Sequence, residues 1–254
     1  MKGEQGNIYF ASDLHLGIPN HQESLIREKR FIRWLEMIKS DATALYLMGD
    51  LFDYWHEYKY VVPKGYVRFL GKLAELRDEG LPIFAFTGNH DLWMFGYFEE
   101  ELGIPVYHQP IVRTFNGKKF FLGHGDGLGP GDTGYKVMKK VFTNRFCQWA
   151  YRQIHPNWAT GMAQFWSQRS KDAQQGSEEE VFKGKEHEWL YLYAQKKLKE
   201  EHFDYFVFGH RHLPLNIDLN EQSKYINLGD WINYNSYAKF DGQQLQLCYF
   251  EQEI

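Results

Sequence analysis

The chain has 254 residues, of which 43% are hydrophobic and 24% charged, and its formal net charge is −4. The apolar fraction supports a sizeable core and excludes a disordered chain, while the negative balance argues against a protein that coats nucleic acid with its whole surface. The longest apolar runs are about six residues, which is far too short to cross a bilayer.

The first third of the chain alternates short apolar runs with amphipathic helical patterns. Strands are predicted at 8–11, 44–48 and 83–86, and helices between them at 24–40 and 67–77. Strands that alternate with helices form a parallel sheet through right-handed crossovers. The sequence therefore predicts the α/β class.

The other predicted strands come later, at 119–122, 205–208, 225–228 and 245–250. We expect these four to form a second sheet with hairpin-like connections, because Asp241-Gly242 is a strong turn signal. The sequence therefore predicts two sheets in the domain.

Between residues 123 and 205 no strand pattern is convincing, and helical periodicity prevails. We interpret this stretch as a helical insertion in an α/β body. The predicted organisation is one domain over 1–254, with a helical cap inserted at about 128–200.

The N-terminal residues 1–7 contain neither a basic region nor an apolar run, so they show no secretory signal. Cys147 and Cys248 lie far apart and form no metal-binding or redox spacing, which favours a reducing compartment. We therefore expect a cytoplasmic protein.

Five short polar motifs come directly after predicted strands. In open α/β sheets, ligands gather outside the carboxyl ends of the strands. Any one of these motifs alone is explained as well by a helix cap or a turn, but five in order point to a shared site. The motifs are Asp13-Leu14-His15, Gly49-Asp50, Gly88-Asn89-His90-Asp91, Gly123-His124-Gly125-Asp126 and Gly209-His210-Arg211-His212.

Seven side chains in these motifs offer nitrogen or oxygen ligands and no sulfur. They are Asp13, His15, Asp50, Asn89, His124, His210 and His212. Such a set of nitrogen and oxygen donors is typical of a site for Mn, Fe or Zn and not of a thiolate-ligated metal site. Seven ligands are too many for one ion, but two ions that share the Asp50 carboxylate would use them all. Two such ions favour hydrolysis of a phosphate ester or anhydride.

The five motifs resemble those of the calcineurin-like metallophosphoesterase superfamily. That resemblance implies a four-layer α-β-β-α sandwich of two mixed sheets, with two metal ions at the sheet edge. It assigns one ion to Asp13, His15, Asp50 and His212, and the other to Asp50, Asn89, His124 and His210. It also implies that His90 is catalytic, lies beside the scissile group and is oriented by Asp91.

A narrower resemblance, to the UDP-2,3-diacylglucosamine pyrophosphatases of lipid A biosynthesis, rests on residues 49–55 and 227–231 and on the helical insertion. It implies cleavage of that lipid-linked nucleotide sugar to UMP and 2,3-diacylglucosamine 1-phosphate. It also implies two divalent metal ions, for which Mn²⁺ is expected and Fe or Zn are alternatives. It places the protein peripherally on the cytoplasmic face of the inner membrane. The substrate-binding residues that it implies are Asn89, His90, Asp132, Ser170, Gln174 and His210.

One position departs from the narrower family, whose third motif usually ends Asn-Arg-Asp where this chain has Asn89-His90-Asp91. An arginine would bind a second phosphate as a fixed charge, whereas a histidine can protonate a leaving group. A phosphodiesterase or nuclease with another phosphate substrate therefore stays open as an alternative. A non-catalytic binding scaffold is a further alternative, although all seven ligand positions are filled.

The segment 133–171 lacks Asp and Glu but contains seven cations and eight aromatic residues. The cations are Lys136, Lys139, Lys140, Arg145, Arg152, Arg169 and Lys171. Such a cap suits an anionic membrane surface and acyl chains. The alternatives are a lid whose aromatic residues fill its own core and a surface for single-stranded nucleic acid. Nucleic acid is the less favoured, because the cations occupy one segment rather than a groove traced along the chain.

Overall fold

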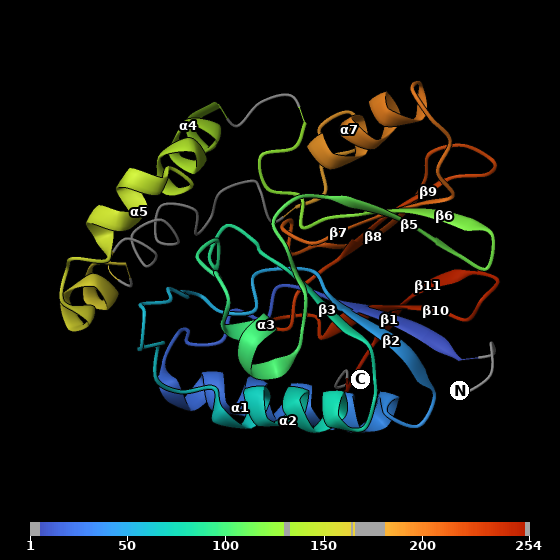
Figure 1. The fold of residues 1–254 in the computed structure, drawn as a ribbon. Helices are drawn as coiled ribbons and strands as arrows, with labels where there is room; N and C mark the ends of the chain where they lie inside the picture. The colour runs from blue at the N-terminus through green and yellow to red at the C-terminus, as the bar shows by residue number, and fades with distance from the viewer. Residues whose placement is uncertain (1–5, 130–132, 164, 166–180, 252–254) are drawn as a thin grey trace.

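A computed structural model describes residues 6–129, 133–163, 165 and 181–251, and it contains two β-sheets with helices outside them (Figure 1). The first sheet has the strand order β11-β10-β1-β2-β3-β4. Strands β1 to β4 are mutually parallel, and the β10–β11 pair joins β1 in antiparallel orientation. These strands span Asn7–Ala11 (β1), Ala42–Leu47 (β2), Ile83–Phe86 (β3), Val106–Tyr107 (β4), Ser236–Phe240 (β10) and Leu245–Tyr249 (β11).

The second sheet has the order β5-β6-β7-β9-β8. Its three central strands, β6, β7 and β9, are parallel, and the edge strands β5 and β8 run antiparallel to their neighbours. These strands span Ile111–Phe115 (β5), Lys118–Leu122 (β6), Tyr205–Phe208 (β7), Pro214–Asp218 (β8) and Lys224–Leu228 (β9).

Side-chain alternation along the strands divides the apolar residues between the core layers. In β1, Phe10 points into the cluster between the two sheets, whereas Tyr9 and Ala11 belong to the cluster under the outer helices. In β6, Phe120 fills the space between the sheets and Phe121 faces the opposite side. The sheets are apolar on both faces, so each needs a helical layer outside it.

Helices supply both outer layers (Figure 1). Helices α1 (His21–Ile38), α2 (Val67–Asp78) and α3 (Tyr97–Leu102) bury residues such as Trp34 against the first sheet. Helix α7 (Trp189–Leu198) packs Leu190 on the second. The predicted α/β class and four-layer sandwich of two mixed sheets are confirmed. Within the described ranges, no helix has the length and apolar character needed to cross a bilayer.

One strand lies in a different sheet from the one we expected. The predicted strand 245–250 forms β11, which pairs with β10 in the first sheet rather than joining the second. The Asp241-Gly242 turn does join a hairpin, but β10 was not predicted, and β10 pairs with β1. The pairing of β10 with β1, between the two ends of the chain, therefore decides that the hairpin belongs to the first sheet. Strands β4, β5 and β8 were not predicted either.

The cap begins with helices α4 (Thr133–Phe142) and α5 (Arg145–Tyr151), and residues 156–163 are also helical. Aromatic side chains of the body make several of its contacts with the cap. Trp93 Nε1 donates to the Phe142 carbonyl over 2.8 Å, the hydroxyls of Tyr54 and Tyr151 lie 3.1 Å apart, and Tyr58 donates to the Ile154 carbonyl over 3.3 Å. The boundaries 1–254 and 128–200 stay a prediction.

Candidate metal centre

The strand ends bring the five motifs to one edge of the sandwich. The amide of Asp13, after β1, donates to the Gly49 carbonyl after β2 over 3.1 Å. The amide of Gly209, after β7, donates to the His124 carbonyl after β6 over 2.9 Å. The two pairs of loops are joined across the sheets by Asp13, whose carboxylate accepts the His210 amide at 3.0 Å.

Two glycines let these loops approach each other closely. A Cβ atom on Gly88 would lie 2.1 Å from Asp50 Oδ1, and one on Gly209 would lie 2.4 Å from Asp13 Oδ2. Both separations are far below van der Waals contact, so neither position tolerates a side chain without movement of a carboxylate. The glycines that precede the motifs therefore make room for the ligands.

The backbone at these strand ends also adopts left-handed dihedrals, which residues other than glycine rarely take. Each such residue costs on the order of 1–2 kcal/mol, and strained residues of this kind cluster at functional sites, where the surrounding structure holds them. Five of the seven predicted ligands have a positive φ: Asp13 (56°), His15 (43°), Asp50 (51°), His210 (68°) and His212 (54°).

Four of the predicted ligands form a first group, in which one atom from each lies within 4.8 Å of the others: Asp13, His15, Asp50 and His212. Nε2 of His15 lies 3.1 Å from Nε2 of His212 and 3.6 Å from Oδ2 of Asp50. Nε2 of His212 lies 3.4 Å from Oδ1 of Asp13. Nitrogen and oxygen atoms thus converge on one small volume.

A second group contains Asp50, His124 and His210. Nε2 of His124 lies 3.3 Å from Asp50 Oδ2, and the Asn89 side-chain oxygen lies 3.3 Å from Nε2 of His124 and 2.8 Å from Nδ1 of His210. Asp50 belongs to both groups. All seven predicted side chains therefore meet in one centre, with this carboxylate between the two groups.

Outer contacts orient several of these side chains. Nδ1 of His124 lies 2.9 Å from the Met48 carbonyl, which holds a proton on Nδ1 and leaves Nε2 as the nitrogen that would bind an ion once its own proton is released. Nδ1 of His212 lies 3.5 Å from Oδ2 of Asp230, a fully buried carboxylate. Asp230 was not singled out from the sequence, although it lies in the quoted stretch 227–231.

The charges of the centre favour a cation. Burial alone would lower the pKa of both His15 and His124, yet neighbouring carboxylates outweigh it and raise the pKa of His15 to about 9 and that of His124 to about 10. Burial would likewise raise the pKa of Asp13 and Asp50, but the histidines hold both below the usual value. Two buried carboxylates therefore stay ionised, in a place that attracts positive charge.

His90 lies beside the first group, with its ring 4.7 Å from that of His15. Its Nδ1 is 3.4 Å from Asp53 Oδ1 and 3.0 Å from the Asp53 carbonyl. The expected partner, Asp91, instead accepts the backbone amides of Leu51 at 2.8 Å and Gly88 at 2.6 Å.

The expectation that Asp91 orients His90 is therefore wrong, because Asp91 holds the backbone of two loops and Asp53 is the carboxylate at His90. Burial raises the pKa of Asp91, which agrees with its lack of contact with solvent. Asp53 lies three residues after Asp50, within the stretch 49–55 that carries the narrower resemblance. Its spacing alone did not identify it.

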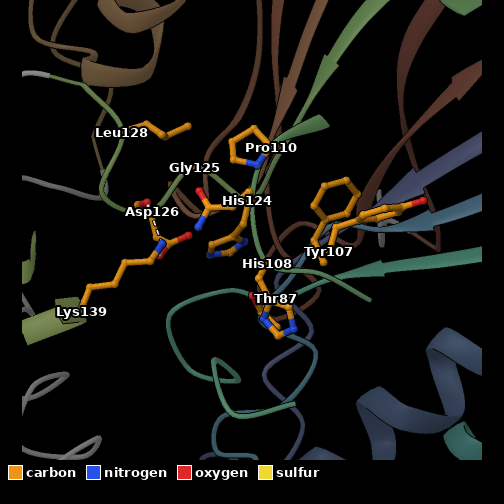
Figure 2. A pocket seen from close by; sticks show the side chains of 11 residues that line it. Thr87, Tyr107, His108, Pro110, His124, Gly125, Asp126, Leu128 and Lys139 are labelled. Carbon is orange, nitrogen blue, oxygen red and sulfur yellow. Dashed lines mark hydrogen bonds and ion pairs between the residues drawn. The ribbon is translucent and has the colours of Figure 1, made fainter. Parts of the chain in front are cut away.

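Three predicted substrate contacts, Asp132, Ser170 and Gln174, lie outside the described residues. Asp126, in the fourth motif, is described, and its carboxylate faces the cap. It accepts a hydrogen bond from the Tyr135 hydroxyl over 2.5 Å. It also pairs with Lys139 Nζ over 2.5 Å (Figure 2). One of the cations that we assigned to a membrane surface, Lys139, therefore points inward.

The donor set fits a pair of divalent cations. It offers carboxylate oxygens, imidazole nitrogens and one amide oxygen, with no thiolate. Burial, together with the charge of His124, lowers the pKa of His210 to about 4, so this imidazole is neutral and ready to donate its electron pair. The arrangement is suited to hold cations against a phosphoryl group.

Comparison with known proteins gives two findings. The model of the calcineurin-like phosphoesterase family matches residues 6–214. A UDP-2,3-diacylglucosamine hydrolase from Porphyromonas gingivalis is 41% identical over 96% of this chain and 97% of its own length. Proteins of the same name are 28% identical in Edwardsiella ictaluri, over 94% of this chain and 90% of that one, and 25% identical in Shewanella putrefaciens, over 94% of both.

Proposed function

The chain belongs to the calcineurin-like phosphoesterase family, and from this premise we propose that it hydrolyses the pyrophosphate of UDP-2,3-diacylglucosamine to UMP and 2,3-diacylglucosamine 1-phosphate. The observation that carries the proposal is the near-complete alignment with a hydrolase named for that substrate, at 41% identity. Family and relatives make the protein a hydrolase, which disfavours a non-catalytic scaffold.

The family is metal-dependent, and we propose how this chain holds its metals. Asp13, His15, Asp50 and His212 would bind one divalent ion, and Asp50, Asn89, His124 and His210 the other. The two atom groups that share Asp50 support this division. Mn²⁺ is the proposed metal, since mixed imidazole and carboxylate ligands suit it, with Fe or Zn as alternatives. Elemental analysis of the protein, followed by reconstitution with each metal, tests the identity.

When bound, such ions lower the pKa of coordinated water and neutralise charge on phosphoryl oxygens. The protein's own groups orient the substrate. His90, held through Nδ1 by Asp53, would place its other ring nitrogen toward the departing sugar phosphate and stabilise or protonate it. Asp91 would keep the loops of Asp50 and His90 in register, through the amides of Leu51 and Gly88.

The decisive experiment is a product assay with detergent-solubilised UDP-2,3-diacylglucosamine and the metal-loaded protein. We expect UMP and the acylated sugar phosphate. Release of UDP would place the cleavage at the sugar–phosphate bond and contradict the proposal, as would no turnover under conditions in which another phosphate substrate is hydrolysed.

A second candidate keeps the reaction class and changes the substrate to a phosphodiester. His90 favours it, because a histidine can assist a poor leaving group, whereas the narrower family usually has arginine there. Cyclic nucleotides and single-stranded DNA, assayed beside the lipid, distinguish the two. A kcat/KM for either that exceeds the value for the lipid would favour this candidate.

We also propose that the outer face of the cap rests on an anionic membrane surface. Phe146 is 71% exposed and Trp149 58%, and Lys140 and Arg145 are exposed on the same two helices. Apolar rings beside cations are typical of interfacial binding. Lys139 is not part of this face, because it pairs with Asp126.

Vesicle binding tests the surface. The double substitution Lys140→Glu and Arg145→Glu should weaken partitioning onto anionic vesicles at least about thirtyfold, because two cations near such a surface contribute about 1 kcal/mol each and the new carboxylates are repelled by it. The control is Lys29→Glu with Lys64→Glu, at exposed positions of the body. Equal loss in both doubles, or none in either, would contradict a cap-specific surface.

A further inference from the structure

A pocket lies beside the metal centre, between the end of β3, the β4–β5 connection and the loop after β6. Figure 2 shows Tyr107 and His108 on one side of it and Asp126 with Lys139 on the other. We call it the His108 pocket; its polar lining includes Thr87, Tyr107, His108, Gln109, Asp126 and Lys139. The pocket is small and partly open to solvent, so it suits one part of a larger substrate rather than the whole.

The pocket and the metal centre share a wall. His124 lines the pocket and also belongs to the group with Asp50 and His210. The side chain is 3% exposed and is fixed by the Met48 carbonyl. A phosphorus atom held at that group would therefore have the His108 pocket directly on one flank, within reach of a substituent that it carries.

The lining of the pocket carries no unbalanced charge. The Lys139 ammonium is paired with the Asp126 carboxylate over 2.5 Å. Partial burial and the Lys139 charge lower the pKa of His108, so its imidazole is neutral at neutral pH. The other polar groups of the lining are the Thr87 hydroxyl, the Gln109 carboxamide and the His108 imidazole. They interrupt the apolar surface, which comes from Phe86, Tyr107, Pro110 and Leu128.

This chemistry discriminates between the parts of the substrate. A second phosphate would need an unpaired cation, and an acyl chain would need continuous apolar walls. A flat heterocycle with carbonyl and N–H groups needs uncharged donors and acceptors and a ring to pack on. Of the three, the last matches the lining.

His90 adjoins the other atom group of the centre, where it lies against Asp53 and His15, whereas the His108 pocket adjoins His124. The same loop continues to Trp93, whose indole donates to the Phe142 carbonyl of the cap. With the departing group directed toward His90, the group that stays on the attacked phosphorus has the His108 pocket beside it.

We propose that the His108 pocket binds the uracil nucleoside, the half of the substrate that remains on the attacked phosphorus and departs as UMP. The inference rests on the proposed function for the identity of the base. Gln109 and His108 are then specificity-determining residues. They contact the nucleoside and do not bind the metals, which the ligands at the strand ends hold.

The experiment uses UMP, ribose 5-phosphate and inorganic phosphate as inhibitors of bis(p-nitrophenyl) phosphate hydrolysis by the metal-loaded full chain, with calorimetric binding of the same three compounds as a second readout. The wild type should bind UMP at least about tenfold more tightly than ribose 5-phosphate, because hydrogen bonds to the base are worth about threefold to tenfold each. Gln109→Ala and His108→Ala should each weaken the binding of UMP about threefold to tenfold and leave the binding of phosphate unchanged. Gln222→Ala and His202→Ala, at exposed positions elsewhere, should change neither.

The outcomes separate the two proposals. Equal binding of UMP and ribose 5-phosphate, or unchanged UMP binding in both pocket variants, would overturn the pocket assignment even if the lipid substrate is cleaved. Tight UMP binding that Gln109→Ala and His108→Ala weaken, in a protein that releases no UMP from the lipid, would support a nucleotide pocket and overturn the lipid substrate instead.

Discussion

The metal centre and the cap lie next to each other but are built in opposite ways. In the centre, Asp13 and Asp50 are at most 1% exposed, and their loops are tied by backbone hydrogen bonds between strand ends. In the cap, Phe146, Trp149 and Trp158 are 58 to 74% exposed. The fold therefore positions the polar groups of the centre by burial and backbone hydrogen bonds, whereas the cap leaves large apolar side chains exposed.

The largest expected effect is at the carboxylate that both atom groups share. Asp50→Asn keeps the size of the side chain and removes its charge, so both ions should be lost and activity should fall at least about a thousandfold, or about 4 kcal/mol in barrier. Elemental analysis and kcat/KM are the measurements. Asp241→Asn, in an exposed turn, is the control. Two ions per chain in the Asp50 variant would contradict its bridging position.

The free energy of unfolding should respond more to a substitution in the buried core of the body than to one on the exposed cap. Leu73→Ala removes a fully buried side chain of α2 and should lower the free energy of unfolding by about 2–5 kcal/mol. Val141→Ala, at a 49% exposed position of α4, should change it by less than about 0.5 kcal/mol. Chemical denaturation measures both. A comparable loss in the two variants would mean that Val141 is covered by a partner in solution.

His90 should matter according to the leaving group. With a phosphodiester that has a poor leaving group, His90→Ala should lower kcat about a hundredfold, the usual range for a lost general acid. With UDP-2,3-diacylglucosamine the loss should be less than about tenfold, since a sugar phosphate leaves readily without full protonation. Steady-state kinetics of both substrates test this, and equal losses would rule out leaving-group assistance.

A further expected effect is a dependence of the stability of the metal-free protein on pH. The pKa values of His15 and His124 are raised in the folded protein to about 9 and 10. The stability contributed by their protons in the metal-free protein is therefore fully present below the unfolded value of about 6.5 and is lost as pH rises through 9 to 10. Melting temperature against pH measures it.

Because the ions replace these protons, metal binding near neutral pH should release about two protons, and metal affinity should rise with pH. Calorimetry in two buffers of different ionisation enthalpy counts the protons. A heat that is the same in both buffers would show that the two imidazoles are already neutral, contrary to the charges of the centre.

The sequence predicted the centre because its residues follow parallel strands, whose carboxyl ends share one edge. Asp13, Asp50 and Asn89 follow the neighbouring strands β1, β2 and β3, so their convergence needs only the sheet order. Helices α1 and α2 were also predicted, because their apolar residues recur at helical spacing. Sequence patterns were therefore sufficient where the spacing of nearby residues determines the structure.

The errors came from contacts between distant parts of the chain. The β10–β11 hairpin joins the first sheet through the pairing of β10 with β1, a contact between the two ends of the sequence. The role of Asp53 appears only when its loop folds against His90, and that of Asp91 only when Leu51 and Gly88 turn their amides toward it. No spacing rule distinguishes these two carboxylates in advance.

The left-handed residues of the centre have a consequence for the choice of cation. Their torsional strain is balanced during folding by the packed strands, so an incoming ion meets donors that already stand in position. Exchange of one divalent cation for another would then need no rearrangement of the main chain, and the exchange would change the Lewis acidity of the centre while the donor positions stay the same.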